Sequence, residues 1–186
     1  MKRALFVLAL AGEGRTIRMI RSLSPSDFDA VLRVINDAAQ AYKGIIPDDR
    51  WKLPYMSSEE LKEEIEAGTR FFGWVENENL LGVMGIQPIR GTTLIRHAYV
   101  FTKYQGRGIG ASLLRHLVGL AETAEILVGT WADATWAIRF YEKRGFKLVS
   151  QKEKDRLLRA YWTIPERQVG TSVVLRFTKQ TGDSIV

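Results

Sequence analysis

The 186-residue chain is 46% apolar and 26% charged, with a formal net charge of +6 at neutral pH. These values are typical of a soluble globular protein of one domain, and no apolar run reaches the length that a membrane-spanning helix needs. Cysteine is absent and the only histidines are His97 and His116. This excludes disulfide bonds, a thiolate metal site and a cysteine nucleophile, and it leaves too few ligands for a metal centre. The basic residues are scattered, so they predict an anionic ligand rather than nucleic acid.

The chain begins with MKRALFVLALAGEGR, in which two basic residues precede an apolar stretch and an Ala9-x-Ala11 pattern. Because the apolar stretch is short, a secretory signal is the less favoured interpretation. We predict a mobile N-terminal extension over residues 1–15 and a single domain over residues 16–180, since no repeat, low-complexity tract or linker divides it.

The first predicted elements are a strand and a capped helix. Apolar and basic residues alternate from Thr16 to Ser22, which favours a strand. In the following SPSDFDAVLRVINDAAQ, Ser24 can cap a helix, Pro25 suits its first turn and Asp27 is placed for a capping box.

A second helix is predicted for SSEELKEEIEAG by the same kind of signal. Ser57 and Glu60 have the spacing of a capping box, and Gly68 is placed to end the helix. Leu61 and Ile65 recur at helical spacing, so we expect both to face inward.

The middle of the chain is predicted to be strand-rich. RFFGWVE and LLGVMGIQPI, residues 70–76 and 80–89, are apolar runs separated by the polar turn NEN and favour a β-hairpin. Residues 92–101 predict a further strand. A helix begins at Gly108, with its apolar residues on one face.

The last third alternates strands and helices. Residues 125–131 predict a strand and residues 134–144 a helix ended by Gly145. Residues 146–150 and 171–177 predict the last strands, and KEKDRLLR between them reads as a solvated turn of helix. This order predicts an α/β fold that is antiparallel in the middle and crosses over through helices later.

Gly106, Gly108 and Gly110 follow a strand and lead directly into a helix. A helix N-terminus carries unpaired N–H groups and a partial positive charge, and glycines allow a ligand to approach the backbone. The loop therefore predicts a site for a pyrophosphate, with Arg107 adding a charge that can reach it.

Three other interpretations of the loop carry less weight. Gly106-x-Gly108-x-x-Ala111 formally satisfies a dinucleotide fingerprint, but it follows several strands and no acidic residue ends the next strand. A nucleoside-triphosphate loop needs Gly-Lys-Ser/Thr, which the chain lacks. Glycines kept for packing alone stay open.

Two motifs carry a resemblance to a known family. Gln105-x-x-Gly108-x-Gly110, after a strand ending Tyr99–Val100, resembles the acetyl-CoA motif of the GNAT N-acetyltransferase superfamily. AIRFYEKRGF, from Ala137 to Phe146, resembles its second hallmark. The resemblance extends from about Thr16 to Phe177, and AYKGIIPDDRW and YWTIPERQ resemble a prokaryotic branch.

The resemblance implies a mixed, mostly antiparallel sheet of six to seven strands flanked by about four helices. It implies direct transfer of the acetyl group from acetyl-CoA, as co-substrate and without a metal, to a primary amine of a small molecule, amino acid or peptide. The alternative is a catalytically silent CoA-binding sensor or interaction module. The residues that it places on the cofactor are Ala98, Tyr99 and Val100 along the pantetheine arm, and Gln105, Gly106, Arg107, Gly108, Ile109, Gly110 and Ala111 on the pyrophosphate.

The resemblance also assigns the proton donor. Tyr141 matches the tyrosine that protonates the departing thiolate, which is reasonable because a thiol and a phenol differ modestly in pKa. The alternative is an aromatic that packs beside Phe140. Where many relatives have an asparagine that contacts CoA, this chain has Ala134, and either Asp133 or Thr135 could replace it.

The general base is not located by the resemblance. Some relatives carry a glutamate where this chain has Gly129. His97 is our candidate because it is the only histidine on the central strand, with a core or edge histidine or a water chain as alternatives. Which of Arg96 and His97 faces the cleft stays open.

The acceptor site is predicted from aromatic residues near the first two helices and the last hairpin. The family fold brings these segments to one cleft, although core packing explains most tryptophans. The candidates are Tyr42, Trp51, Trp131 and Tyr161, with Trp136 and Trp162 beside them. We expect a cytoplasmic protein that binds neither nucleic acid nor membrane, and we leave a homodimer open.

Overall fold

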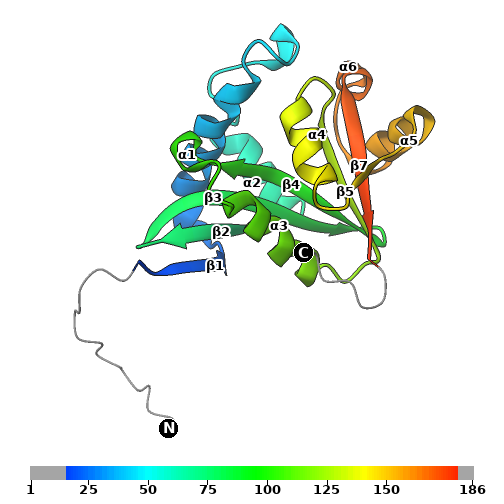
Figure 1. Cartoon of the computed structure of the whole chain (residues 1–186). Helices are drawn as coiled ribbons and strands as arrows, with labels where there is room; N and C mark the ends of the chain where they lie inside the picture. Colours follow the sequence, from blue (N-terminus) through cyan, green and yellow to red (C-terminus); the bar gives the residue numbers. More distant parts are fainter. Residues whose placement is uncertain (1–15, 180–186) are drawn as a thin grey trace, which may run out of the picture.

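The computed structural model describes residues 16–179, and the predictions for residues 1–15 lie outside this range (Figure 1). The strands are β1 (Arg18–Ser22), β2 (Arg70–Glu76), β3 (Asn79–Ile89), β4 (Thr92–Val100), β5 (Glu125–Trp131), β6 (Lys147–Leu148) and β7 (Ser172–Thr178). The helices are α1 (Phe28–Ala38), α2 (Ser58–Glu66), α3 (Ile109–Leu120), α4 (Thr135–Glu142), α5 (Gln151–Tyr161) and α6 (Glu166–Gly170). No helix in this range is long and apolar enough to cross a membrane.

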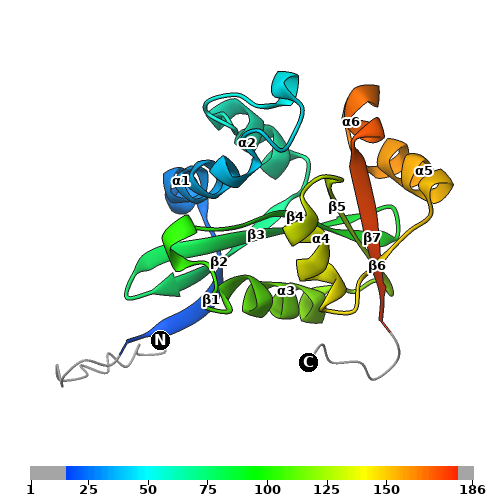
Figure 2. The same ribbon diagram turned by 45° about the horizontal axis from the view of Figure 1, so that its top comes forward.

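The strands form one sheet in the order β1-β2-β3-β4-β5-β7-β6. All neighbours are antiparallel except β4 and β5, which are parallel and joined through α3. The predicted mixed, mostly antiparallel α/β fold is therefore confirmed. In Figure 2, α1 and α2 cover one face of the sheet and α3 covers the other.

Local sequence signals begin two of the helices as predicted. The Asp27 carboxylate accepts a hydrogen bond from the Ser24 backbone N–H at 2.9 Å. Ser57 and Glu60 form the reciprocal capping box at 2.8 and 3.1 Å. Each box satisfies N–H groups that a helix start leaves free, so these two boundaries follow from short-range chemistry.

The core divides between the two faces of the sheet. On the α3 face, Leu113, Leu114 and Leu117 are fully buried against β3, β4 and β5. On the opposite face, Val34 and Ile35 of α1 are fully buried. A third cluster holds α5 and α6 against β5 and β7.

Several expectations about the last third are wrong in detail. The described residues contain six α-helices rather than about four, because KEKDRLLR lies in an eleven-residue α5 and a short α6 follows it. This helix is not merely solvated, since Lys154, Leu157 and Leu158 are buried. The Lys154 side chain is buried, and its ammonium donates to the Val169 carbonyl at 2.7 Å. The strand expected over residues 146–150 is reduced to the two residues of β6.

The inward face of α2 also differs from the prediction. Leu61 is fully buried, but Ile65 is 46% exposed. The residue that turns inward beside Leu61 is Glu64, whose side chain is 21% exposed. The carboxylate of Glu64 therefore lies on the inward face of α2, where the apolar periodicity predicted Ile65.

Candidate active site

The site begins where β4 and β5 separate. These strands pair only from Thr93 to Ile95 against Ile126 to Val128. Beyond this point no strand within residues 16–179 lies beside the edge of β4 that faces β5. The separation opens the sheet on both faces at once.

One cavity, of about 440 Å³, lies on the α3 side of the opening. It contains nine of the ten predicted cofactor residues, all except Arg107. The strand contributes Ala98, Tyr99 and Val100; the loop and helix contribute Gln105, Gly106, Gly108, Ile109, Gly110 and Ala111; and Trp136, Phe140 and Arg144 of the α4 region form the opposite wall.

The loop backbone fits a diphosphate. The first helical hydrogen bond of α3 runs from the Ser112 N–H to the Gly108 carbonyl at 3.0 Å, so the N–H groups of Ile109, Gly110 and Ala111 have no partner within the helix. Gly106 and Gly108 have φ of 77° and 80°, which favours glycine, and a Cβ on either would meet no atom within 4 Å. The cavity thus has free donors and open space at the end of a helix dipole.

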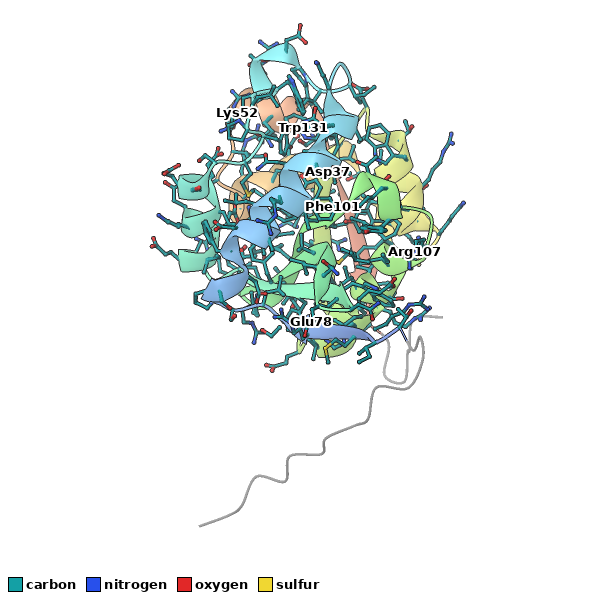
Figure 3. All side chains as sticks on the ribbon, turned by 90° about the vertical axis from the view of Figure 1, so that its left-hand side faces the viewer. Asp37, Lys52, Glu78, Phe101, Arg107 and Trp131 are labelled. Carbon is teal, nitrogen blue, oxygen red and sulfur yellow. The ribbon has the colours of Figure 1, made fainter. Side chains whose placement is uncertain are left out.

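The turn before this loop is held by α1. The Thr102 N–H donates to the Asp37 carboxylate at 2.7 Å, and Figure 3 shows Asp37 close to Phe101. The Gln105 side chain donates to the Val100 carbonyl at 3.1 Å. These contacts fix where strand β4 passes into the loop.

The Arg107 side chain has an acidic partner outside the α3-side cavity. Its guanidinium pairs with the Glu76 carboxylate at 2.9 Å, and that carboxylate also binds Arg18. Figure 3 places Arg107 far from Trp131 at the edge of the molecule. The backbone of Arg107 is part of the glycine loop, but its side chain pairs with Glu76 and does not line the cavity. Contact of the Arg107 side chain with an anion therefore stays a prediction.

The opposite face carries two adjoining cavities of about 240 and 690 Å³. Tyr55, Trp131 and His97 border both of them. The smaller one reaches the opening between β4 and β5, and the larger one extends outward past α2. Of the predicted acceptor residues, Tyr42 borders the smaller cavity, Tyr161 the larger and Trp131 both, whereas Trp51 packs behind Tyr55 with ring centroids 5.8 Å apart.

The two faces meet at two tyrosines. Tyr42 and Tyr99 border both the α3-side cavity and the smaller cavity on the opposite face. Burial raises the pKa of Tyr99 well above its ordinary value, with Tyr55 and Tyr42 adding to the effect. Burial and Tyr55 likewise raise the pKa of Tyr42, although a hydrogen bond to Thr130 opposes them. Both phenols are therefore neutral at physiological pH.

A β-bulge decides which residues of β4 face the second pair of cavities. Gly85 of β3 is opposite Arg96 and Val83 is opposite Tyr99, so β4 has one residue more than its partner. His97 takes up the extra residue with φ of 49°. The alternation of side chains is interrupted there, and Arg96 and His97 lie on the same face.

Both of these side chains meet Glu64 of α2. Its Oε1 lies 2.7 Å from Nη2 of Arg96 and its Oε2 lies 3.2 Å from Nε2 of His97. Burial by itself would raise the pKa of Glu64, but His97 and Arg96 outweigh it and the pKa falls below the ordinary value. The carboxylate is therefore charged at neutral pH.

Trp162 occupies the space next to Gly129. A Cβ on Gly129 would lie 3.3 Å from the Trp162 ring. The space at the position where some relatives carry a glutamate is thus filled by the indole of the residue that follows α5. Ala134 is fully buried and borders none of these three cavities.

Tyr141 does not line the α3-side cavity, although its neighbours Phe140 and Arg144 do. It is 5% exposed, and its ring packs against Phe140 and Phe146 with centroids 5.0 and 5.5 Å away. Burial and the neighbouring Tyr42 raise the pKa of Tyr141, whereas Arg144 acts in the opposite direction. The phenol keeps its proton at neutral pH, and its role as donor stays a prediction.

Sequence reasoning missed Glu64, Tyr55, Phe140 and Arg144. A signal existed for Glu64, because it follows the buried Leu61 by three residues and so shares its helix face. Phe140 and Arg144 are four residues apart within the motif quoted from Ala137 to Phe146, so the motif itself was the signal for them. Tyr55 is far from the other site residues in the chain and joins them only in the folded protein.

The family comparison decides the identity. The model of the acetyltransferase (GNAT) family matches residues 32–146, more than half of the chain. The chain belongs to the GNAT family. The matched range contains the glycine loop, the bulge and Tyr141 of this GNAT protein. No curated protein sequence matches it.

Solved structures share the GNAT fold. The PaiA N-acetyltransferase from Thermoplasma acidophilum, crystallised with coenzyme A, is 20% identical with a TM-score of 0.68, over 88% of this chain and 99% of that one. The ribosomal-protein-S18-alanine N-acetyltransferase from Escherichia coli is 18% identical with a TM-score of 0.64, over 91% and 99%. A GNAT acetyltransferase from Elizabethkingia anophelis with acetyl-CoA bound is 18% identical with a TM-score of 0.58, over 87% and 98%.

Proposed function

We propose that this GNAT protein transfers the acetyl group of acetyl-CoA directly to a primary amine of a small molecule, amino acid or peptide. The observation that carries the proposal is the meeting of the two faces at Tyr42 and Tyr99. A ligand held in the α3-side cavity reaches, at this point, the cavities in which an acceptor would lie.

The chain's own residues divide the work between binding and proton transfer. The free N–H groups of Ile109, Gly110 and Ala111 hold the diphosphate. The free edge of Ala98 to Val100 accepts the pantetheine arm as an added strand. Acetyl-CoA supplies the acetyl group as a thioester.

Two side chains handle protons in this proposal. His97, beside the acceptor cavities, removes the proton that the amine must lose in order to attack. Tyr141 gives a proton to the departing sulfur and regains one from solvent. The chain has no cysteine, so it offers no thiol on which an acyl group could rest.

The test is amine-dependent release of free thiol. Purified protein and acetyl-CoA are combined with a panel of alkyl amines, amino acids and peptides, and thiol is followed with a chromogenic disulfide. We expect turnover with at least one amine class and an acetylated product of the corresponding mass.

Calorimetry with CoA separates this function from its alternative. CoA binding without thiol release for any amine would indicate a silent CoA-binding module. Absence of CoA binding would exclude both the acetyltransferase function and the silent CoA-binding module. A cytoplasmic location and the choice between monomer and homodimer stay predictions.

A further inference from the structure

We propose that Glu64 is a positioning residue of the reaction, which acts through His97 by fixing the imidazole tautomer and leaving Nδ1 as the atom that takes the proton from the amine. This inference rests on the proposed function and deepens it. The sequence places Glu64 about thirty residues before His97, and only the packing of α2 on the bulge of β4 brings the two together.

The first observation is the position of the imidazole. Its positive φ places His97 on the same face as Arg96, at the border of both acceptor cavities. The side chain is 15% exposed, and the Phe71 ring lies 5.7 Å away, centroid to centroid. His97 thus has a backbone conformation that non-glycine residues rarely adopt, and its side chain borders the cavities proposed for the acceptor.

The second observation is the unequal surroundings of the two ring nitrogens. Nε2 is buried and lies 3.2 Å from Oε2 of Glu64, but the contact lacks the direction of a hydrogen bond, and within residues 16–179 Nε2 has no other partner. A buried polar atom without a hydrogen bond is uncommon, and before substrate binds, catalytic contacts are often imperfectly aligned. A carboxylate can only accept, so this contact favours the tautomer with its proton on Nε2.

The third observation concerns the charges that face His97. Glu64 comes from α2, and Arg96 precedes His97 on β4. Gln87 of β3 accepts from Arg96 at 3.0 Å, and Thr69 donates to Oε2 of Glu64 at 3.3 Å. The pKa of Glu64 is lowered despite its burial, so the carboxylate that faces the ring is ionised.

The proton inventory closes when Tyr141 is counted beside these groups. The ammonium of the acceptor gives one proton to Nδ1 of His97, and the imidazolium that forms is stabilised by the Glu64 carboxylate, which stays unprotonated. The freed nitrogen lone pair forms the bond to the acetyl carbon while the carbon–sulfur bond breaks; Tyr141 gives a proton to the departing sulfur, the amide nitrogen loses its second proton to solvent, and Tyr141 regains one from solvent. The ring then loses its proton to solvent through the larger cavity.

If Glu64 had a purely structural role, the losses of kcat in the single and double variants would follow a different pattern. If the carboxylate served only to neutralise Arg96, its loss would act independently of His97. The effects of two residues that act through one group are not additive, whereas the effects of independent residues are.

The experiment is a double-mutant cycle with Glu64→Gln and His97→Gln. The control is Glu66→Gln, on the same helix, because Glu66 borders none of the three cavities described above. We expect Glu64→Gln to lower kcat by about 10- to 100-fold with unchanged CoA affinity, and the double variant to be no slower than His97→Gln. The deficit should shrink as the pH approaches the pKa of the amine, since the free base needs no proton acceptor.

A second measurement does not depend on turnover. The chain has two histidines, so ¹⁵N ring shifts are assigned with His116→Gln alone. We expect wild-type His97 to carry its proton on Nε2, with this preference lost in Glu64→Gln. A wild-type proton on Nδ1, unchanged kcat in Glu64→Gln, or additive losses in the cycle would each overturn the proposal. If no amine is acetylated, the proposed function fails, but the ring shifts still decide which tautomer His97 adopts. If Glu64→Gln does not fold, the ring shifts of the wild-type protein alone decide it.

Discussion

Gly110→Val tests whether the start of α3 holds the diphosphate by close backbone approach. A Cβ at this position would lie 3.4 Å from the Phe140 ring and 3.8 Å from Val100, which both border the α3-side cavity. The two methyl groups of valine extend one bond further, so they either displace Phe140 or take up the space that the ligand needs. The backbone of Gly110 has no positive φ, so the substitution does not strain it.

The expected loss of CoA affinity follows from the hydrogen bonds between backbone amides and the diphosphate that the valine prevents. One charge-assisted hydrogen bond is worth roughly 1.5–3 kcal/mol. At 1.4 kcal/mol per tenfold, loss of one amide contact weakens CoA binding about 10- to 150-fold. The fold is affected little, because valine is better than glycine in a helix by a few tenths of a kcal/mol, which offsets part of the crowding against Phe140.

Calorimetric titration with CoA measures the effect, and thermal unfolding without CoA reports on stability. Gly119→Val is the matched control, since Gly119 lies in the same helix and a Cβ there would meet nothing within 4 Å. We expect the control to bind CoA like wild type. Equal affinity in Gly110→Val and Gly119→Val would refute a cradle made by this helix start.

Three further predictions concern the proton donor, the acceptor cavity and a helix cap. Tyr141→Phe should lower kcat for amine acetylation by about 10²-fold or more while CoA affinity is unchanged, because only the hydroxyl is removed; unaltered turnover would exclude it as the donor. Trp162→Leu enlarges the space beside Gly129, so KM for bulky amines should fall relative to small ones while KM for acetyl-CoA stays constant; parallel changes across a size series of amines would contradict this. Asp27→Asn should lower the free energy of unfolding by about 1–2 kcal/mol at pH 7, since Arg21 holds the pKa of Asp27 far below its usual value. The difference should begin to fall below about pH 4, where the unfolded-state carboxyl takes up its proton, and should vanish only when the folded-state carboxyl is protonated as well; a difference that does not change between pH 7 and pH 2 would rule out this origin.

The sequence predicted the features whose signals lie within a few residues of one another. Ser24 with Asp27, and Ser57 with Glu60, announce helix starts because a side chain can reach only the next turn. The glycine loop is local in the same sense, since positive φ and free helix amides depend on the loop's own residues. Nine of the ten cofactor residues that the family resemblance implies lie around one cavity.

The acceptor side resisted prediction because its residues are far apart in the chain. Periodicity could not show that β4 contains a bulge at His97, as the bulge depends on the register with β3. It assigned Ile65 to the interior, where Glu64 instead accepts hydrogen bonds from Arg96 and Thr69 and lies 3.2 Å from His97. Where α5 lies it predicted only a solvated turn of helix, because that sequence has few apolar residues, yet Lys154, Leu157 and Leu158 are buried.

The amino-acid sequence by itself therefore predicted most of the elements and the glycine loop, since these follow from backbone propensity and short-range hydrogen bonds, and its two motifs carried the resemblance to the GNAT family. The tertiary structure alone decided how Glu64, Arg96 and His97 combine, and it placed Trp162 against Gly129. The physical reason is that charge pairing and steric occupancy depend on distances in space, which the chain sets only when α2 and α5 pack against the opened sheet.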